Sequence, residues 1–449
     1  MLKKLFFLLL LITSITNAQY SIKGKMEPAN KYSWIVLYQL QGAKQNYITN
    51  TNLINGEFNI TMPEKAKNGI YRLVYDLENR LFVDFIFDNE NVSLNFNPKY
   101  PSQSVEFNDS ATNQLFTIYL NSVLKIQSKL DSLQVKFFNS SDKFEQENIT
   151  SVYKNYYNQL NDIQTKSEEA TKGEFVYHYI KASARFNNKT PIRNPVEYLS
   201  SIKSHFFDNI DFNSEALLNS TFINDKINDF IFYLNTAEDN KVLNQLQKEA
   251  ISTVINKLSS NKTLAKDIEE GLIYTFSKQE NIIMVNCMLN HYLQLPKELQ
   301  DAPFINDIKG QLKTAIGMLA PNIFWSEKTL KKDLNGLSNA NYYVVAFWSS
   351  TCSHCLKEMP LLYDFLKDNG QIKVISVGLE DNTSKAGWET QIANYPNFIN
   401  VYGENKWKNN FARNYGVNAT PSFYILDADK KIIAKPDDVD ELTTFFTKN

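Results

Sequence analysis

The stretch that decides the fold of the C-terminal part of this chain is VVAFWSSTCSHCLKEMP, residues 344–360. The apolar run predicts a strand over Tyr342–Phe347, and the apolar residues that follow the cysteines predict a helix through Met359. Cys352 and Cys355 therefore fall where a strand gives way to a helix. A pair spaced C-x-x-C closes too small a loop to join distant parts of a fold, so we expect it to be kept for its reactivity.

The residues that follow this stretch continue the alternation of strands and helices. We expect a strand over Ile372–Leu379 and a helix over Glu404–Tyr415. A hairpin of Ser422–Leu426 with Lys431–Ala434 and a last helix over Asp437–Lys448 should follow. Strands that alternate with helices in this way predict an α/β domain, which we place at residues 320–449.

The dithiol suggests a specific chemistry. The thiolate, rather than the thiol, attacks a disulfide, and a helix N-terminus favours an anion because its backbone N–H groups have no partner within the helix. We therefore expect Cys352 to be the exposed nucleophile and Cys355 the buried resolving thiol, with His354 adding positive charge when protonated. The alternatives are a static disulfide, two inert thiols, or half of a zinc site, which would need two further ligands.

Two further segments, VISVGLED (374–381) and YGVNATPSFYILDADKKIIAK (415–435), together with the first stretch resemble the TlpA/ResA group of thioredoxin-family extracytoplasmic oxidoreductases. The resemblance covers roughly residues 320–449. It implies that Thr420 contacts the active-site cysteines and that Pro421 is a cis proline whose flat backbone edge docks the partner peptide. It also matches the family motif C-x-x-E-x-P, in which Glu358 follows Cys355 by one helical turn, so its carboxylate is expected to accept and return the cysteine protons.

The sequence also departs from that group. Thr351 stands where the family usually has Trp, and Ala346 stands where thioredoxin has a buried acid, which excludes a proton relay through an aspartate there. Glu358, His354 or water must then move protons. Ser353 and His354 should tune the redox potential, and a histidine before the second cysteine resembles the oxidising members, so the direction of electron flow stays open.

The chain begins with Met-Leu-Lys-Lys, an apolar run and a small-residue exit ending at Ala18, which predicts a cleaved signal peptide over residues 1–18. We expect export to the periplasm or cell envelope, and a soluble chain after cleavage. The net charge of −2 argues against a nucleic-acid partner.

The remaining residues predict two more segments. Short runs with period two, such as Phe58, Ile60 and Met62 in EFNITM, predict an antiparallel β-sandwich over residues 19–108. Apolar residues at helical spacing predict a helical domain over 109–319. SIKGKM, INGEFNI and VEFNDSATNQLF resemble an N-terminal β domain that precedes thioredoxin modules in exported Bacteroidetes-type proteins.

The sequence therefore predicts an extracytoplasmic thiol-disulfide oxidoreductase that needs no metal or cofactor. Its expected partners are protein thiols and disulfides and a membrane or periplasmic redox partner, while homo-oligomer formation stays open. The alternative is a cell-envelope binding protein in which the thioredoxin fold is a scaffold. The third cysteine, Cys287, lies four residues before His291, but two ligands make no metal site, and we interpret Cys287 as a small buried residue.

Overall fold

The computed structural model describes residues 19–29, 31–327 and 330–448. The chain divides into two compact units, residues 1–268 and 269–449, which are treated separately below. The predicted signal peptide lies outside the described residues. The domain limits predicted at 108/109 and 319/320 stay predictions.

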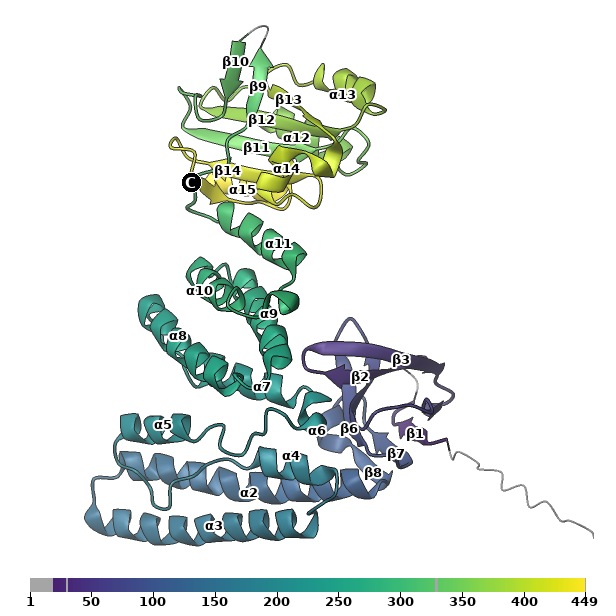
Figure 1. The fold of residues 1–449 in the computed structure, drawn as a ribbon, viewed down its shortest axis with the longest axis vertical. Helices are drawn as coiled ribbons and strands as arrows, with labels where there is room; N and C mark the ends of the chain where they lie inside the picture. Colours follow the sequence, from purple (N-terminus) through teal and green to yellow (C-terminus); the bar gives the residue numbers. More distant parts are fainter. Residues whose placement is uncertain (1–18, 30, 328–329, 449) are drawn as a thin grey trace, which may run out of the picture. The chain divides into compact units, whose positions relative to one another are not determined.

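The first unit begins with two four-stranded sheets, ordered β4-β1-β7-β8 and β3-β2-β5-β6 (Figure 1). The strands are β1 Ser21–Met26, β2 Trp34–Gln41, β3 Lys44–Asn52, β4 Glu57–Thr61, β5 Gly69–Asp76, β6 Leu81–Phe87, β7 Val92–Phe96 and β8 Glu106–Asp109, with a short helix α1, Pro101–Ser104, before the last. Both sheets contribute to one core, and Phe58, Ile60 and Met62 are buried in it as their alternation predicts.

The prediction of a β-rich N-terminal sandwich is confirmed, with one difference in strand direction. β1 pairs with β7 in parallel, whereas the other pairs in these two sheets are antiparallel. Parallel neighbours need a long crossover instead of a hairpin. Here the chain between β1 and β7 includes all the strands from β2 to β6. The alternation of residues within β1 and β7 therefore could not predict that these two strands pair in parallel.

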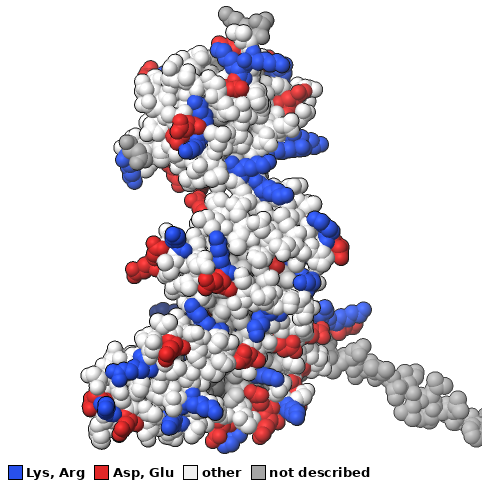
Figure 2. Space-filling view, turned by 60° about the vertical axis from the view of Figure 1, so that its left-hand side comes forward, with Lys and Arg blue, Asp and Glu red and all other residues white. Residues whose placement is uncertain are grey.

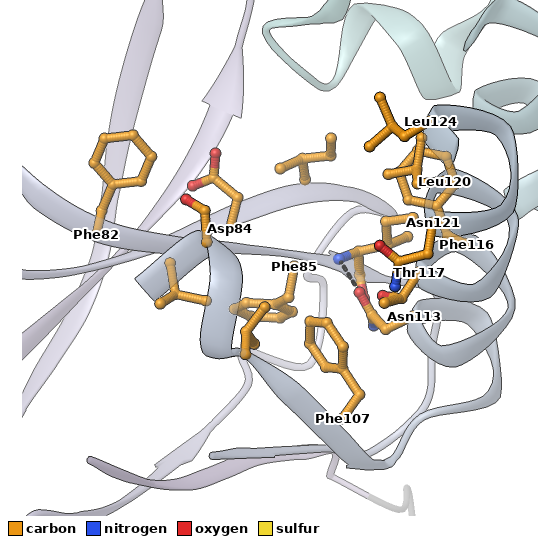
Figure 3. A pocket seen from close by; sticks show the side chains of 15 residues that line it. Phe82, Asp84, Phe85, Phe107, Asn113, Phe116, Thr117, Leu120, Asn121 and Leu124 are labelled. Atoms are coloured by element: carbon orange, nitrogen blue, oxygen red, sulfur yellow. Dashed lines mark hydrogen bonds between the residues drawn. The ribbon is translucent and has the colours of Figure 1, made fainter. Parts of the chain in front are cut away.

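The outer edge of β6 is held by one asparagine from helix α2, Ala111–Asn139. The Ile86 backbone N–H donates to Asn113 Oδ1 at 2.8 Å, and Asn113 Nδ2 donates to the Ile86 carbonyl at 2.7 Å, with both residues buried. Figure 3 shows Asn113 beside a pocket of about 350 Å³ to which β6 and α2 contribute side chains. The amide thus replaces a neighbouring strand at this edge.

We expect Asn113→Ala to destabilise the first unit by about 2–4 kcal/mol, because two buried backbone groups would lose their partners. Hydrogen exchange of the β6 peptide, read by mass spectrometry, measures the loss. Asn121→Ala is the matched control, since Asn121 lies on the same helix and lines the same pocket but is exposed. Unchanged protection of β6 in Asn113→Ala would contradict the interpretation.

Helices make up the rest of the first unit, as predicted. They are α2, α3 Lys143–Ala170, α4 Val176–Ser183, α5 Pro195–Ser204, α6 Glu215–Leu218, α7 Phe222–Asn228 with a π-helical turn Asp229–Tyr233, α8 Asn240–Lys257, and α9 Lys262–Lys278, which crosses into the second unit. α2 packs against α3 around Leu130, Tyr153 and Leu160.

None of the described helices is long and apolar enough to cross a membrane. On the face drawn in Figure 2, basic and acidic side chains are interspersed.

The second unit contains a five-stranded sheet of order β13-β12-β11-β14-β15, which confirms the predicted α/β domain. The strands are β11 Tyr342–Trp348, β12 Ile372–Glu380, β13 Ile399–Glu404, β14 Ser422–Leu426 and β15 Ile432–Ala434; a hairpin, β9 Phe324–Glu327 with β10 Leu330–Asp333, precedes them. The helices are α10 Ile282–Tyr292, α11 Ala302–Lys313, α12 Cys355–Leu366, α13 Lys385–Ile392, α14 Asn410–Tyr415 and α15 Val439–Lys448.

β11 is the central strand and is buried on both faces. Its residues Tyr343, Val345 and Phe347 belong to one core, which α14 covers, while Val344 and Trp348 belong to the other, which α12 and α15 cover. β12 runs parallel to β11 and β14 antiparallel to it. The carboxyl end of β11 therefore leads into α12 next to the start of β14, and this end of the sheet carries the candidate site.

Residues 385–415 differ from the prediction of a single helix at Glu404–Tyr415. α13 comes first, then β13 on the edge of the sheet, and only Asn410–Tyr415 is α-helical. β13 carries polar and glycine residues within six positions, which hides a strand from pattern analysis. Gly403 is required there because an added Cβ would lie 2.9 Å from the Gly378 carbonyl oxygen.

Candidate functional site

The two cysteines meet at the start of α12. They form a disulfide with a Cα–Cα distance of 5.2 Å; Cys352 is partly exposed and Cys355 is fully buried. The Cys355 backbone N–H donates to Cys352 Sγ at 3.1 Å, and the Leu356 N–H donates to the Cys352 carbonyl at 3.1 Å. The first N–H of the helix thus points at the Cys352 sulfur, which is where a thiolate gains most from a helix N-terminus.

The dipeptide between the cysteines faces solvent. Ser353 and His354 are both exposed. His354 is the residue that precedes the helix, and its carbonyl accepts from the N–H groups of Lys357 and Glu358 at 3.0 and 3.1 Å. The imidazole makes no hydrogen bond that caps the helix.

The loop before β14 lies against the nucleophile. The Thr420–Pro421 peptide bond is cis, the conformation that the resemblance implies. The Thr420 carbonyl oxygen lies 3.4 Å from Cys352 Sγ, and both loop residues are partly exposed. The structure thus places Thr420 and Pro421 next to the cysteine pair, although Thr420 lies 68 positions after Cys352 in the sequence.

Glu358 lies within the first turn of α12 and is partly buried. Its Oε2 accepts from the Val439 N–H at 2.9 Å, so the carboxylate caps α15. Its predicted role in proton transfer stays a prediction. Pro360 follows inside the same helix.

A second carboxylate near the site was missed by the sequence analysis. Glu380, the last residue of β12, is fully buried. Its Oε1 accepts from the Ser350 N–H at 2.5 Å and its Oε2 from the Ser349 hydroxyl at 3.3 Å. The available signal was a charged residue at the end of the apolar run VISVGL, but the sequence does not show what such a residue contacts.

The residues set aside earlier stay outside this site. Cys287 lies in α10, is partly buried and forms no disulfide. Within the part of the chain that the structure describes, no group of three His, Cys, Asp or Glu side chains is placed to hold a metal ion.

Comparison with known proteins agrees with this arrangement. Residues 339–432 match the model of a family described as thioredoxin-like. The chain is 30% identical over 130 residues to the thiol-disulfide oxidoreductase ResA of Bacillus thuringiensis and to that of Bacillus anthracis, which covers 27% of this chain and 69% of each relative. Among solved structures, it is similar to a domain of a possible thiol-disulfide isomerase from Cytophaga hutchinsonii, with 30% identity, a TM-score of 0.26, and 30% and 91% of the two chains covered. A thioredoxin-like protein from Bacteroides caccae is 17% identical with a TM-score of 0.38, over 59% and 98% of the two chains.

Proposed function

Because this chain belongs to the thioredoxin-like family of thiol-disulfide oxidoreductases, we propose that it exchanges disulfides with protein substrates outside the cytosol, through Cys352 and Cys355. The observation that carries the proposal is the Cys355 N–H directed at Cys352 Sγ, 3.1 Å away. A partly exposed sulfur held by a helix N-terminus is suited to attack, whereas the buried Cys355 is suited to resolve the product.

In the reduced enzyme, the Cys352 thiolate attacks one sulfur of a substrate disulfide. The substrate S–S bond breaks, a mixed disulfide with Cys352 forms, and the other substrate sulfur leaves as a thiolate that takes up a proton. Cys355, once deprotonated, then attacks Cys352 Sγ and releases the second substrate thiol. Two electrons pass to the substrate, and the enzyme is left with the disulfide seen in the structure. Running the same steps backwards oxidises a substrate dithiol.

Partner docking is proposed for the edge formed by Thr420 and Pro421. Because proline has no N–H, the Thr420 carbonyl and the residues around it present an acceptor-rich backbone edge next to the sulfur. An extended substrate segment could pair with such an edge by main-chain hydrogen bonds. The exposed His354 would face the same substrate.

The location outside the cytosol rests on the predicted signal peptide over residues 1–18. Protein disulfides persist in oxidising compartments such as the bacterial periplasm, which would supply substrates for this dithiol. The redox partner that restores the enzyme would then be a membrane or periplasmic protein.

Cys355→Ser should trap the mixed disulfide, because Cys352 can still attack while the resolving thiol is missing. We expect a covalent adduct with insulin that a reducing agent dissolves, visible by non-reducing electrophoresis and mass spectrometry. The double variant Cys352→Ser/Cys355→Ser, which retains Cys287, is the control and should form no adduct. Absence of both trapping and insulin reduction at every redox poise would overturn the proposal.

The second candidate is a cell-envelope binding protein, and the pocket of about 350 Å³ in the first unit favours it. Mostly apolar side chains line this pocket, including Phe82, Phe116 and Leu120, as ligand pockets require. Equilibration with glutathione separates the candidates: a disulfide too stable to be reduced in the catalytic range of potentials favours the binding protein.

A further inference from the structure

We infer that Glu380 is a positioning residue of the redox site: its buried carboxylate holds the turn Ser349–Cys352 and thereby keeps Cys352 at the start of α12. This inference rests on the function proposed above, in that Cys352 is taken as the attacking sulfur.

The turn is bonded both to itself and to Glu380. The Cys352 N–H donates to the Ser349 carbonyl at 3.1 Å, and the Thr351 N–H lies 3.3 Å from Ser349 Oγ, to which it donates. Glu380 accepts from the Ser349 hydroxyl and from the Ser350 N–H. Two consecutive residues of the turn are thus fixed to one carboxylate that comes from a neighbouring strand.

The strand register explains why an acceptor is needed at this point. β11 pairs with β12 up to Trp348 opposite Gly378, and beyond it the chain leaves the sheet. The Ser350 N–H therefore has no strand neighbour to bond. Glu380, two residues past Gly378, supplies the acceptor from its side chain, and such an acceptor is needed because an unpaired N–H in a buried setting is costly.

Two physical effects of Glu380 on Cys352 have opposite signs. If Glu380 acted through its charge, neutralising it would favour the thiolate and raise the reactivity of Cys352. If it acts by holding the turn, neutralising it while keeping an acceptor should change little, whereas removing the acceptor should let the sulfur move away from the Cys355 N–H. Gln and Ala substitutions therefore separate the two effects.

The experiment measures alkylation of the reduced full-length chain by iodoacetamide between pH 5 and 10, with Cys352 followed by peptide mass spectrometry. Every protein carries Cys287→Ser, so that only the site cysteines react. We expect Glu380→Gln to stay within about twofold of the parent at neutral pH. Glu380→Ala should react about tenfold more slowly, with its pH profile moved up by about one unit, since one pKa unit is a factor of ten.

Glu404→Gln is the matched control. Glu404 is the register partner of Glu380 on β13 but is exposed, so its loss removes the same charge from the same end of the sheet without touching the turn. We expect the parent profile. If Glu380→Gln is as slow as Glu380→Ala, if Glu404→Gln matches Glu380→Ala, or if Glu380→Ala keeps the parent profile, the inference is wrong.

If Glu380→Ala does not fold, Ser349→Ala tests the inference instead. It removes the hydroxyl that donates to Glu380 and leaves no large cavity. Slower alkylation of Cys352 supports the inference, and the parent rate overturns it. Iodoacetamide needs no protein substrate, so this outcome is independent of whether insulin is trapped.

Discussion

Cys352→Ser is expected to abolish thiol-disulfide exchange, with a loss on the order of 10³-fold or more in insulin reduction, because a serine hydroxyl cannot form the mixed disulfide through which exchange proceeds. Cys352 is the partly exposed member of the pair, and its sulfur accepts from the first helix N–H at 3.1 Å. Cys355 is fully buried and cannot replace it as the attacking group. The measurement is the initial rate of insulin reduction under dithiothreitol.

The matched control is Cys287→Ser, the same substitution at the cysteine of α10, which lies outside the dithiol. It should keep the full rate. In the absence of dithiothreitol, pre-reduced Cys355→Ser should show one fast bond-forming step and then stop, since the adduct has no resolving thiol. A Cys352→Ser protein that retained more than about a tenth of the rate would mean that another sulfur attacks.

Much of the site could be predicted from the sequence because its parts are local. A strand, a C-x-x-C and a helix follow one another without interruption between Tyr342 and Leu366, so the position of Cys352 before the helix follows from patterning. Thr420 and Pro421 are distant in sequence, and they were predicted through the resemblance, because no periodicity could join them to the cysteines.

Glu380 could not be predicted because its role depends on strand register. Whether the carboxylate faces the turn or solvent depends on how far β11 extends along β12, and the two strands are separated by a helix. The parallel pairing of β1 and β7 was missed for the same reason. Local patterns predict which face of a strand is buried, but they do not say which strand lies next to it.

The helical segment shows a further limit. Leu124 is one of the apolar residues at helical spacing in α2, yet this residue is 63% exposed. It lines the pocket next to β6, where no described side chain covers it fully. Helical spacing predicted the helix correctly, and the burial of each apolar position depended on how much of that face the neighbouring elements cover.

Trp348→Ala is expected to lower the free energy of unfolding of the second unit by about 4 kcal/mol, as large-to-small changes of buried aromatic residues do. Trp348 is fully buried at the end of β11 and packs in the core that α12 covers. Its Nε1 donates to the Ser376 hydroxyl at 2.7 Å, and that hydroxyl is also buried. The substitution therefore removes packing and leaves a buried polar group without its partner.

Hydrogen exchange of the β11 and β12 peptides in the full-length chain measures this loss without requiring the two units to unfold together. Trp407→Ala is the matched control, since Trp407 is 49% exposed, and it should change protection by less than about 0.5 kcal/mol. Ser376→Ala separates the two contributions: we expect it to lower the free energy of unfolding by about 1–2 kcal/mol, because the indole N–H loses its acceptor while the packing stays.

Since Trp348 directly precedes the turn that Glu380 holds, Trp348→Ala should also slow the alkylation of Cys352, whereas Trp407→Ala should not. Equal effects of the two tryptophan substitutions would show that the β11 core does not support the redox site.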